Sequence, residues 1–211
     1  RNTVELGFLA LVVIFQPELR RFLEKLGTGG PLSSMFGGNN FQSTETAIAQ
    51  TALACTEFSS SKTGALIIFE RDNRLDDQVR TGTVVDADTT AELLKNIFYP
   101  KAPLHDGAVV IREGRILAAG CVLPLSGNAN LSKDLGMRHR AGIGMSESSD
   151  AVVVIVSEET GSIPVAIDGM LKRHLARDTF EMLLRNELLT EESETPARRP
   201  FWKRGKEKSH D

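Results

Sequence analysis

Two adjacent polar residues, His105 and Asp106, are the first candidates for chemistry in this sequence. They follow Pro103 and precede Gly107 and the β-branched run 109–111, so we expect them on a loop that leads into a buried strand. Gly107 would let another group approach the backbone closely. An imidazole beside a carboxylate can bind a metal ion or activate a hydroxyl group, but the same short motif also occurs in solvated turns.

A second polar motif, Arg138-His139-Arg140, comes directly before a segment that contains Gly142 and Gly144. Arginine donates two parallel hydrogen bonds to a phosphate group, and glycines in a turn expose backbone N–H groups. We therefore expect a Gly-rich turn here and interpret the motif as a local polyphosphate site. The alternative is a pair of arginines in surface salt bridges.

The composition limits the classes of protein that this chain can represent. Its 211 residues are 41% hydrophobic and carry a formal net charge of -3, which suits one domain with appendages and excludes a general nucleic-acid binder. Two cysteines, Cys55 and Cys121, stand in apolar or helical surroundings, so we expect buried free thiols rather than a disulfide. The histidines and cysteines lack zinc-ligand spacing.

The two ends of the chain differ in composition from its middle. Residues 1–26 combine an apolar run with a basic amphipathic segment, which we interpret as the end of a membrane helix and its connector, with a core helix as the alternative. The chain starts with Arg1 rather than Met, so we expect the rest of that membrane anchor upstream. Residues 27–41 are interpreted as a linker, and residues 190–211 as a disordered charged tail.

The middle of the chain, residues 42–189, alternates short apolar runs with amphipathic segments. A helix is expected from Ser43 or Thr44 to about Ser59, and another begins in a capping box in which Thr89 is the cap and Glu92 reaches back. Residues 70–83 are expected to form a charged loop. Strands are expected at 65–69, 108–111, 116–123, 151–156 and 163–167, and a last helix at 178–189. Because hairpins join most of these strands, we expect a mixed, largely antiparallel central sheet flanked by helices.

Several motifs, taken in chain order, carry a family resemblance. They are Gly64–Glu70, His105-Asp106-Gly107-Ala108, Cys121–Ser126, Arg138-His139-Arg140 and Ser157–Gly161. Together they resemble the catalytic domain of the diadenylate cyclases, and residues 15–21 resemble the connector in the membrane-anchored members of that family. The similarity covers roughly residues 4–189.

The resemblance implies a reaction in which two ATP molecules condense into cyclic di-AMP and release two pyrophosphates. It also implies that two protomers meet face to face, each with one bound ATP. A cell-membrane location with the catalytic domain in the bacterial cytoplasm follows, with three N-terminal membrane helices. A membrane regulator protein and phosphoglucosamine mutase are the partners associated with members of this type.

The resemblance also assigns roles to individual residues. Asp106, with Gly107 and Ala108, matches the catalytic motif, and its carboxylate would promote deprotonation of the ribose 3′-hydroxyl. His105, Asp106 and Glu159 match the ligands of a divalent metal, for which carboxylate and imidazole together suit Mn²⁺ better than Mg²⁺. The alternatives are a loop-capping aspartate at Asp106 and a solvated turn residue at Glu159.

The remaining matches concern the nucleotide. Arg138, His139 and Arg140 form the family's Arg-His-Arg motif, in which at least one arginine faces phosphate. Ser157 would donate to a phosphate oxygen, and Gly107 would leave room for sugar or phosphate. Leu123 matches the segment whose backbone meets adenine, although an apolar residue at the end of a strand is ordinarily part of a core.

The sequence departs from the family pattern at one point: Met137 stands where threonine is common. A thioether cannot replace the hydroxyl donor, so a weakened enzyme is expected rather than an inactive one. Two other interpretations stay open. The protein could be a sensor that binds ATP or cyclic di-AMP without making it, or a scaffold that anchors partners at the membrane.

Overall fold

The computed structural model describes residues 33–189, except residues 130, 133–134 and 174. The expected membrane segment 1–26, the first part of the expected linker and the expected tail 190–211 lie outside the described residues. All of the motifs that resemble the cyclase catalytic domain lie within them.

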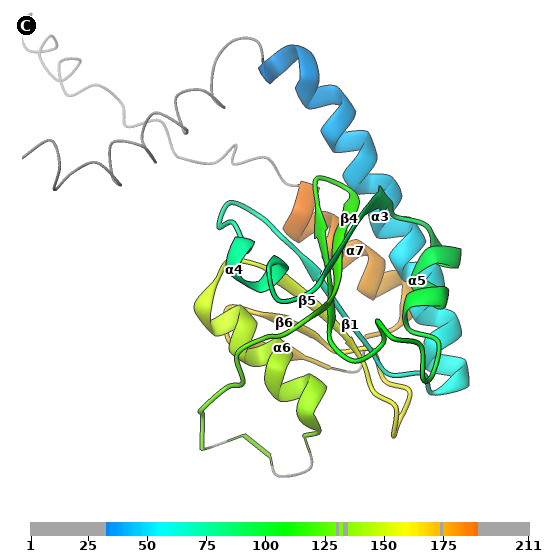
Figure 1. Cartoon of the computed structure of the whole chain (residues 1–211), viewed down its shortest axis with the longest axis vertical. Helices are drawn as coiled ribbons and strands as arrows, with labels where there is room; N and C mark the ends of the chain where they lie inside the picture. The colour runs from blue at the N-terminus through cyan, green and yellow to red at the C-terminus, as the bar shows by residue number, and fades with distance from the viewer. Residues whose placement is uncertain (1–32, 130, 133–134, 174, 190–211) are drawn as a thin grey trace, which may run out of the picture.

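Five helices and seven strands make up the described part of the chain (Figure 1). The helices are α3 (Ser33–Ser61), α4 (Asp76–Val79), α5 (Ala91–Ile97), α6 (Met137–Ser148) and α7 (Arg177–Leu189). The strands are β1 (Ala65–Phe69), β2 (Thr83–Asp88), β3 (Ala108–Arg112), β4 (Arg115–Cys121), β5 (Val152–Val156), β6 (Val165–Ile167) and β7 (Met170–Lys172).

The seven strands form one sheet in the order β2-β4-β3-β1-β5-β6-β7. Only β1 and β3 run parallel, while every other neighbouring pair is antiparallel. The sequence-based expectation of a mixed, largely antiparallel sheet is therefore confirmed. Strand β1 occupies the centre, and the fully buried β5 lies beside it.

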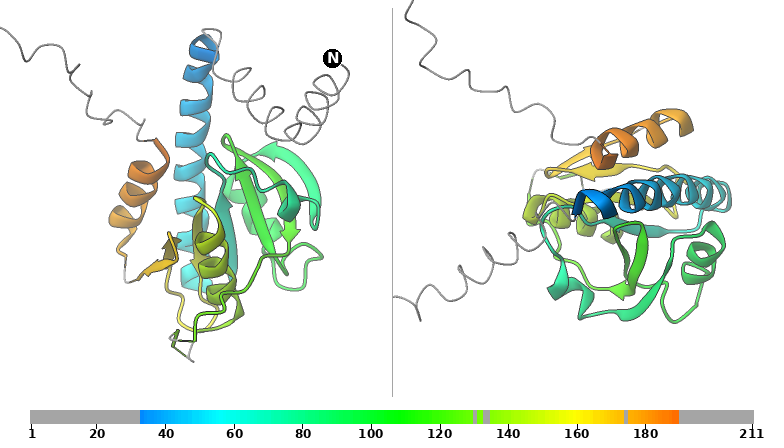
Figure 2. Two further views of the ribbon diagram at one scale, coloured as in Figure 1. Left: turned by 90° about the vertical axis from the view of Figure 1, so that its left-hand side faces the viewer. Right: turned by 90° about the horizontal axis from the view of Figure 1, so that it is seen from above.

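Helices cover both faces of the sheet, so its central strands are apolar on both sides. Alternate residues of β1 show the division, since Ile67 packs into the cluster under α3, α5 and α7, whereas Ile68 packs into the cluster under α6. Helices α3 and α7 lie side by side on the first face (Figure 2). Cys55 and Cys121 are buried free thiols, as expected.

Helix α3 begins earlier than the sequence predicts. The expected linker reached residue 41, but residues 33–41 are helical and continuous with the packed segment that follows. Once Ala47, Ile48 and Ala52 are buried against the sheet, each residue added upstream fixes one backbone unit and gains one helical hydrogen bond. Extension therefore overcomes the poor helix propensity of Gly37 and Gly38.

Two further local predictions were wrong. The side chain of Thr90, not Thr89, caps α5 by accepting a hydrogen bond from the Leu93 N–H, whereas the Thr89 hydroxyl is buried without a partner. The expected loop 70–83 contains the short helix α4, and the unexpected strand β2 follows it. Strand β2 was missed because it lies at the sheet edge with mostly exposed positions, which weakens the hydrophobic alternation.

The strand register determines which loops meet. Ala65 of β1 pairs with Val156 of β5, and the parallel register of Ile67 with Val109 brings the start of β3 to the same level. The loops before β1 and β3 and after β5 therefore converge at one edge of the sheet, which we call the cavity edge (64, 105–107 and 157–159). The opposite ends of these strands form the ion-pair edge (70–76, 112–113 and 150).

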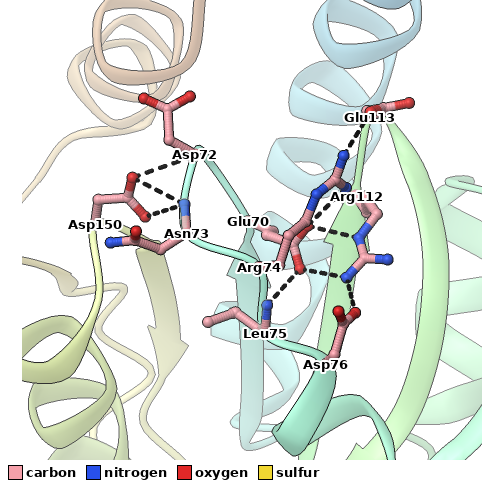
Figure 3. Close-up of polar contacts among 9 residues, drawn as sticks. All are labelled: Glu70, Asp72, Asn73, Arg74, Leu75, Asp76, Arg112, Glu113 and Asp150. Carbon is pink, nitrogen blue, oxygen red and sulfur yellow. Dashed lines mark hydrogen bonds and ion pairs between the residues drawn. The ribbon is translucent and has the colours of Figure 1, made fainter. Parts of the chain in front are cut away.

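Charged side chains at the ion-pair edge form hydrogen bonds and ion pairs with one another (Figure 3). Glu70, whose side chain is 1% exposed, accepts hydrogen bonds from Arg112 Nε at 2.6 Å and Nη2 at 2.8 Å, and from Arg74 Nη1 at 3.1 Å. It also accepts from the Leu75 N–H at 2.9 Å. Arg112 Nη2 also donates to Asp76 Oδ1 at 2.6 Å. The hydrogen bonds to Glu70 and Asp76 raise the pKa of Arg112, with Glu70 the larger cause, and the bond from Arg112 lowers the pKa of Asp76.

The same edge is held to the start of β5 by Asp150. Its carboxylate accepts hydrogen bonds from the backbone N–H groups of Asp72 at 3.1 Å and Asn73 at 3.2 Å. Figure 3 shows both contacts. The ion-pair edge is thus held together by hydrogen bonds and ion pairs among its own residues.

Candidate active site

A cavity of about 480 Å³ opens at the cavity edge. Its walls come from the loop before β3, the first turn of α6 and the turn after β5. The lining residues are His105, Asp106, Gly136, Met137, Arg138, His139, Val156, Ser157, Glu158 and Glu159. Residues from three distant parts of the sequence therefore share one site, and six of them were candidates from the sequence: His105, Asp106, Arg138, His139, Ser157 and Glu159.

His105 lies in the loop before β3 and is held there by a hydrogen bond within that loop. Its Nδ1 lies 2.6 Å from the carbonyl oxygen of Ala102. Because a carbonyl can only accept, Nδ1 carries the hydrogen, and Nε2 of the neutral ring keeps a lone pair. The neighbouring Asp106 is exposed and lines the same cavity. This pair can offer one nitrogen and one carboxylate to a ligand.

Arg138 enters the cavity from the first turn of α6. Its Nη1 donates to Glu158 Oε2 at 2.6 Å, and the Arg138 side chain is 23% exposed while that of Glu158 is 62% exposed. A Cβ atom on Gly64 would lie 2.6 Å from Arg138 Nη1 and 2.9 Å from Glu158 Oε2. Gly64 therefore gives the ion pair the space that it occupies.

The glycines after the Arg-His-Arg motif do not form the expected turn. They lie inside α6, which runs from Met137 to Ser148. A Cβ on Gly142 would lie 2.7 Å from Ile155 Cδ1, and one on Gly144 would lie 2.4 Å from the carbonyl oxygen of Pro124. These glycines let α6 pack closely against β5 and the loop after β4, instead of exposing N–H groups to a ligand.

Backbone donors at the cavity come from the start of α6. Gly136 is the N-cap residue, and no side chain caps the helix there. The first N–H groups of a helix lack intrahelical acceptors, and the helix dipole favours an anion at this end. Gly136 and Met137 line the cavity, so Arg138 stands beside this positive helix end.

His139 is half-buried in the wall of the cavity. Burial lowers the pKa of this imidazole, and the nearby positive charge of Arg173 lowers it further, while Glu159 opposes the shift. Both main effects favour the neutral ring. Arg140 is also half-buried but is not among the lining residues, and its carbonyl oxygen accepts the Ser126 N–H at 3.0 Å.

The turn after β5 is a rigid support for its acidic side chains. Ser157 Oγ accepts the Thr160 N–H at 3.2 Å, and the Ser157 carbonyl accepts the Gly161 N–H at 2.8 Å. Ser59 at the end of α3 donates its hydroxyl to the Gly161 carbonyl at 2.6 Å. The backbone around Glu158 and Glu159 is therefore fixed, while both side chains extend outward and are exposed.

Three other candidates lie outside the cavity lining. Gly107 has a φ of 138°, and a Cβ there would lie 2.6 Å from the Gly120 carbonyl carbon, so the close approach is made by the neighbouring strand. Ala108 is fully buried at the start of β3. Leu123 is partly buried against the core beneath α6. These positions suit residues that support the walls of the cavity, and direct contact with a nucleotide stays a prediction for Gly107 and Leu123.

The predicted metal ligands line the same cavity, but they are not arranged as a complete coordination site. Among residues 33–189 that the structure describes, no group of three or more His, Cys, Asp or Glu side chains is arranged to hold a metal ion. His105 and Asp106 nevertheless supply adjacent nitrogen and oxygen donors, and Glu159 lines the same cavity. This donor set fits a divalent ion whose remaining ligands come from water or phosphate.

Glu158 and Gly64 lie within motifs that resemble the family, but the sequence alone indicated no role for either residue. The ion pair between Glu158 and Arg138 joins the turn after β5 to the start of α6, and a Cβ at Gly64 would crowd the ends of both side chains. The one available signal for Glu158 was its position between Ser157 and Glu159.

Comparisons with known proteins agree with this geometry. Residues 52–171 match the family described as DisA bacterial checkpoint controller nucleotide-binding. The chain is 43% identical over 200 residues to the cyclic di-AMP synthase CdaA of Bacillus subtilis, which covers 95% of this chain and 72% of that protein. The chain belongs to the diadenylate cyclase family. The family and the enzyme class expected from the sequence are confirmed.

Other family members extend the comparison. A diadenylate cyclase of Listeria monocytogenes is 41% identical over 201 residues, covering 95% of this chain and 73% of that protein. The crystal structure of a double mutant of Staphylococcus aureus DacA superposes with a TM-score of 0.68 at 44% identity, over 69% of this chain and 97% of the other.

A fourth protein in the comparison has a name that refers to the membrane. The structure of a hypothetical membrane spanning protein from Bacillus cereus gives a TM-score of 0.59 at 34% identity and covers 83% of this chain and 95% of that one. Within the part of this chain that the structure describes, none of the helices combines the length and apolar character needed to cross a bilayer.

Proposed function

We propose that this diadenylate cyclase family member condenses two ATP molecules into cyclic di-AMP and releases two pyrophosphates. The observation that carries the proposal is the convergence of Asp106, Arg138 and Ser157 on one cavity beside the start of α6. A carboxylate can accept a proton, and a guanidinium and an uncapped helix start can bind phosphate, so this set of groups suits phosphoryl transfer.

Each transfer makes one bond and breaks one. The ribose 3′-oxygen of one ATP attacks the α-phosphorus of the other, the bond to the β-phosphate breaks, and pyrophosphate leaves. Asp106 accepts the proton of the 3′-hydroxyl, and Arg138 offsets the negative charge that develops on the phosphates. Ser157, whose Oγ already accepts a backbone N–H, has its hydroxyl hydrogen left to donate to a phosphate oxygen.

Within this proposal, His105, Asp106 and Glu159 would hold a divalent ion, Mn²⁺ or Mg²⁺, that supplies further charge neutralisation at the phosphates. The hydrogen bond to Ala102 orients His105 for that role. Arg140 and the neutral imidazole of His139 would support Arg138 from within α6. The backbone near Leu123 would contact adenine.

The complete reaction requires a second copy of the chain. One cavity would hold one ATP, so the attacking 3′-oxygen must come from a nucleotide on a facing protomer. Exposure of Met137 (67%), Glu158 and Glu159 at the mouth supports this arrangement, because a facing copy can reach them. A membrane anchor, a membrane regulator protein and phosphoglucosamine mutase remain predictions from the resemblance, and co-purification from membranes would test all three.

The decisive experiment is anion-exchange chromatography of a reaction that contains the protein, ATP and Mn²⁺ or Mg²⁺, with Asp106→Asn as the comparison. Cyclic di-AMP is expected with the unmutated chain only, at a specific activity that rises with protein concentration as dimers form. Absence of product across metals and concentrations would overturn the cyclase proposal, and ATP binding without turnover would favour the nucleotide sensor.

A further inference from the structure

The ion pair between Arg138 and Glu158 lies in the cavity to which the proposed function assigns the phosphate chain of ATP. Arg138 Nη1 is 2.6 Å from Glu158 Oε2, and both residues line the cavity. A guanidinium has five N–H donors in a fixed plane, so one edge can hold a carboxylate while the other stays available. A polyphosphate that approaches this cavity meets an arginine whose charge is already partly neutralised.

The two partners are anchored unequally. Arg138 is three-quarters buried and held in the first turn of α6, whereas Glu158 is 62% exposed on the outside of a rigid turn. Ion pairs with an exposed partner contribute little stability, so separating this pair costs little. A phosphate group carries more charge than a carboxylate and can accept two parallel hydrogen bonds from arginine, whereas Glu158 accepts one from Arg138.

We propose that Glu158 is an exchangeable counter-ion of Arg138, which polyphosphate displaces on binding and which returns when pyrophosphate leaves. Glu158 is then a positioning residue that acts through Arg138: it keeps the guanidinium over Gly64 between turnovers and lowers the affinity of the site for free polyphosphate. This inference rests on the proposed function, because it takes the ligand to be the phosphate chain of ATP.

Isothermal titration of inorganic tripolyphosphate into the folded protein tests the inference without requiring turnover. Glu158→Gln removes the charge but keeps the size and an oxygen that can accept from Arg138. The matched control is Glu113→Gln, which removes an equal charge from an exposed ion pair with Arg74 at the opposite edge. Glu158→Gln is expected to bind tripolyphosphate about three- to tenfold more tightly than the wild type does. The control variant is expected to bind it with the affinity of the wild type.

The salt dependence separates electrostatic competition from a change in shape. The gain in Glu158→Gln should shrink as salt rises from about 0.05 M to about 1 M, because screening shortens the range of charge interactions to about 3 Å. In steady-state assays the KM for ATP should fall while kcat does not rise, and added pyrophosphate should inhibit at lower concentration. A purely structural role of Glu158 would not produce this combination.

The outcomes distinguish the inference from the function on which it rests. Equal or weaker tripolyphosphate binding by Glu158→Gln, or a gain that does not depend on salt, overturns the counter-ion role even if cyclic di-AMP is made. Tighter, salt-dependent binding supports it even if the wild type makes no cyclic di-AMP. If the wild type does not bind tripolyphosphate, the inference is overturned.

Discussion

The two edges of the sheet contain the same kinds of side chain in opposite states. At the ion-pair edge, Glu70 is 1% exposed and has four hydrogen bonds from Arg112, Arg74 and Leu75. At the cavity edge, Arg138 has one exposed carboxylate partner, and the exposed residues Asp106 and Glu159 line the cavity. Charges that partner one another hold the fold together, whereas charges that are incompletely partnered can bind a ligand.

The largest effect on stability is expected at the ion-pair edge. Glu70→Ala would leave the partly buried Arg112 without its main partner, so the free energy of unfolding should fall by about 3 kcal/mol. Urea denaturation followed by circular dichroism measures this change. Glu113→Gln, in an exposed pair with Arg74, should stay within about 0.5 kcal/mol of the wild type. A loss below about 1 kcal/mol for Glu70→Ala would contradict the contrast between the edges.

Arg138→Gln should show the reverse behaviour. It removes a pair with an exposed partner, so the free energy of unfolding should change by less than about 1 kcal/mol. Tripolyphosphate affinity should fall about ten- to a hundredfold, because a charge-assisted contact to phosphate is lost. Titration calorimetry and urea denaturation of the same sample separate the two effects. Large destabilisation with unchanged affinity would place Arg138 among the structural ion pairs.

Two glycines sharpen the comparison on a smaller scale. A Cβ on Gly114, near the ion-pair edge, would lie 2.5 Å from the Ser43 carbonyl carbon and oxygen, and its φ is 81°. Gly114→Ala should therefore cost about 1–3 kcal/mol of stability. Gly64→Ala meets only the ends of flexible side chains, so thermal unfolding should shift little while tripolyphosphate binds several-fold more weakly. Equal thermal shifts would contradict this difference.

The smallest expected effect is the acid response of Asp76. The hydrogen bond from Arg112 holds the pKa of this carboxyl below its ordinary value, so the native state favours the ionised form. Its stabilising contribution is present above about pH 4 and is lost as pH falls through the lower native pKa. The melting temperatures of wild type and Asp76→Asn should therefore differ modestly at pH 7, and the difference should narrow as pH falls below about 4. A difference in melting temperature that does not change with pH would show that ionisation of Asp76 does not contribute to stability.

The sequence allowed correct prediction of features that depend on local pattern. The apolar run 65–69 and the hairpin of β3 and β4 were found from β-branched residues and a Glu-Gly turn. His105 and Asp106 were candidates because an imidazole and a carboxylate stand together on a loop before a buried strand, and the family resemblance separated this interpretation from a solvated turn. The mixed sheet followed from these elements.

Features that depend on tertiary contacts were not predictable in the same way. Gly142 and Gly144 suggested a turn because glycine lowers helix propensity, but close packing against Ile155 and Pro124 stabilises the helix instead. The partnership of Arg138 with Glu158 depends on the packing of α6 against β5, which no local pattern specifies. Direct nucleotide contacts of Leu123 and Gly107 stay predictions.

The single parallel pair in the sheet has a consequence for the order of folding. A hairpin can form as soon as its second strand exists, but β1 and β3 are joined by a crossover that contains α4, β2 and α5, and β1 must wait still longer for β5. Such long-range closures form slowly and late. During synthesis, His105 and Asp106 leave the ribosome well before Glu159, so a nascent chain cannot complete its cavity until most of the domain has been translated.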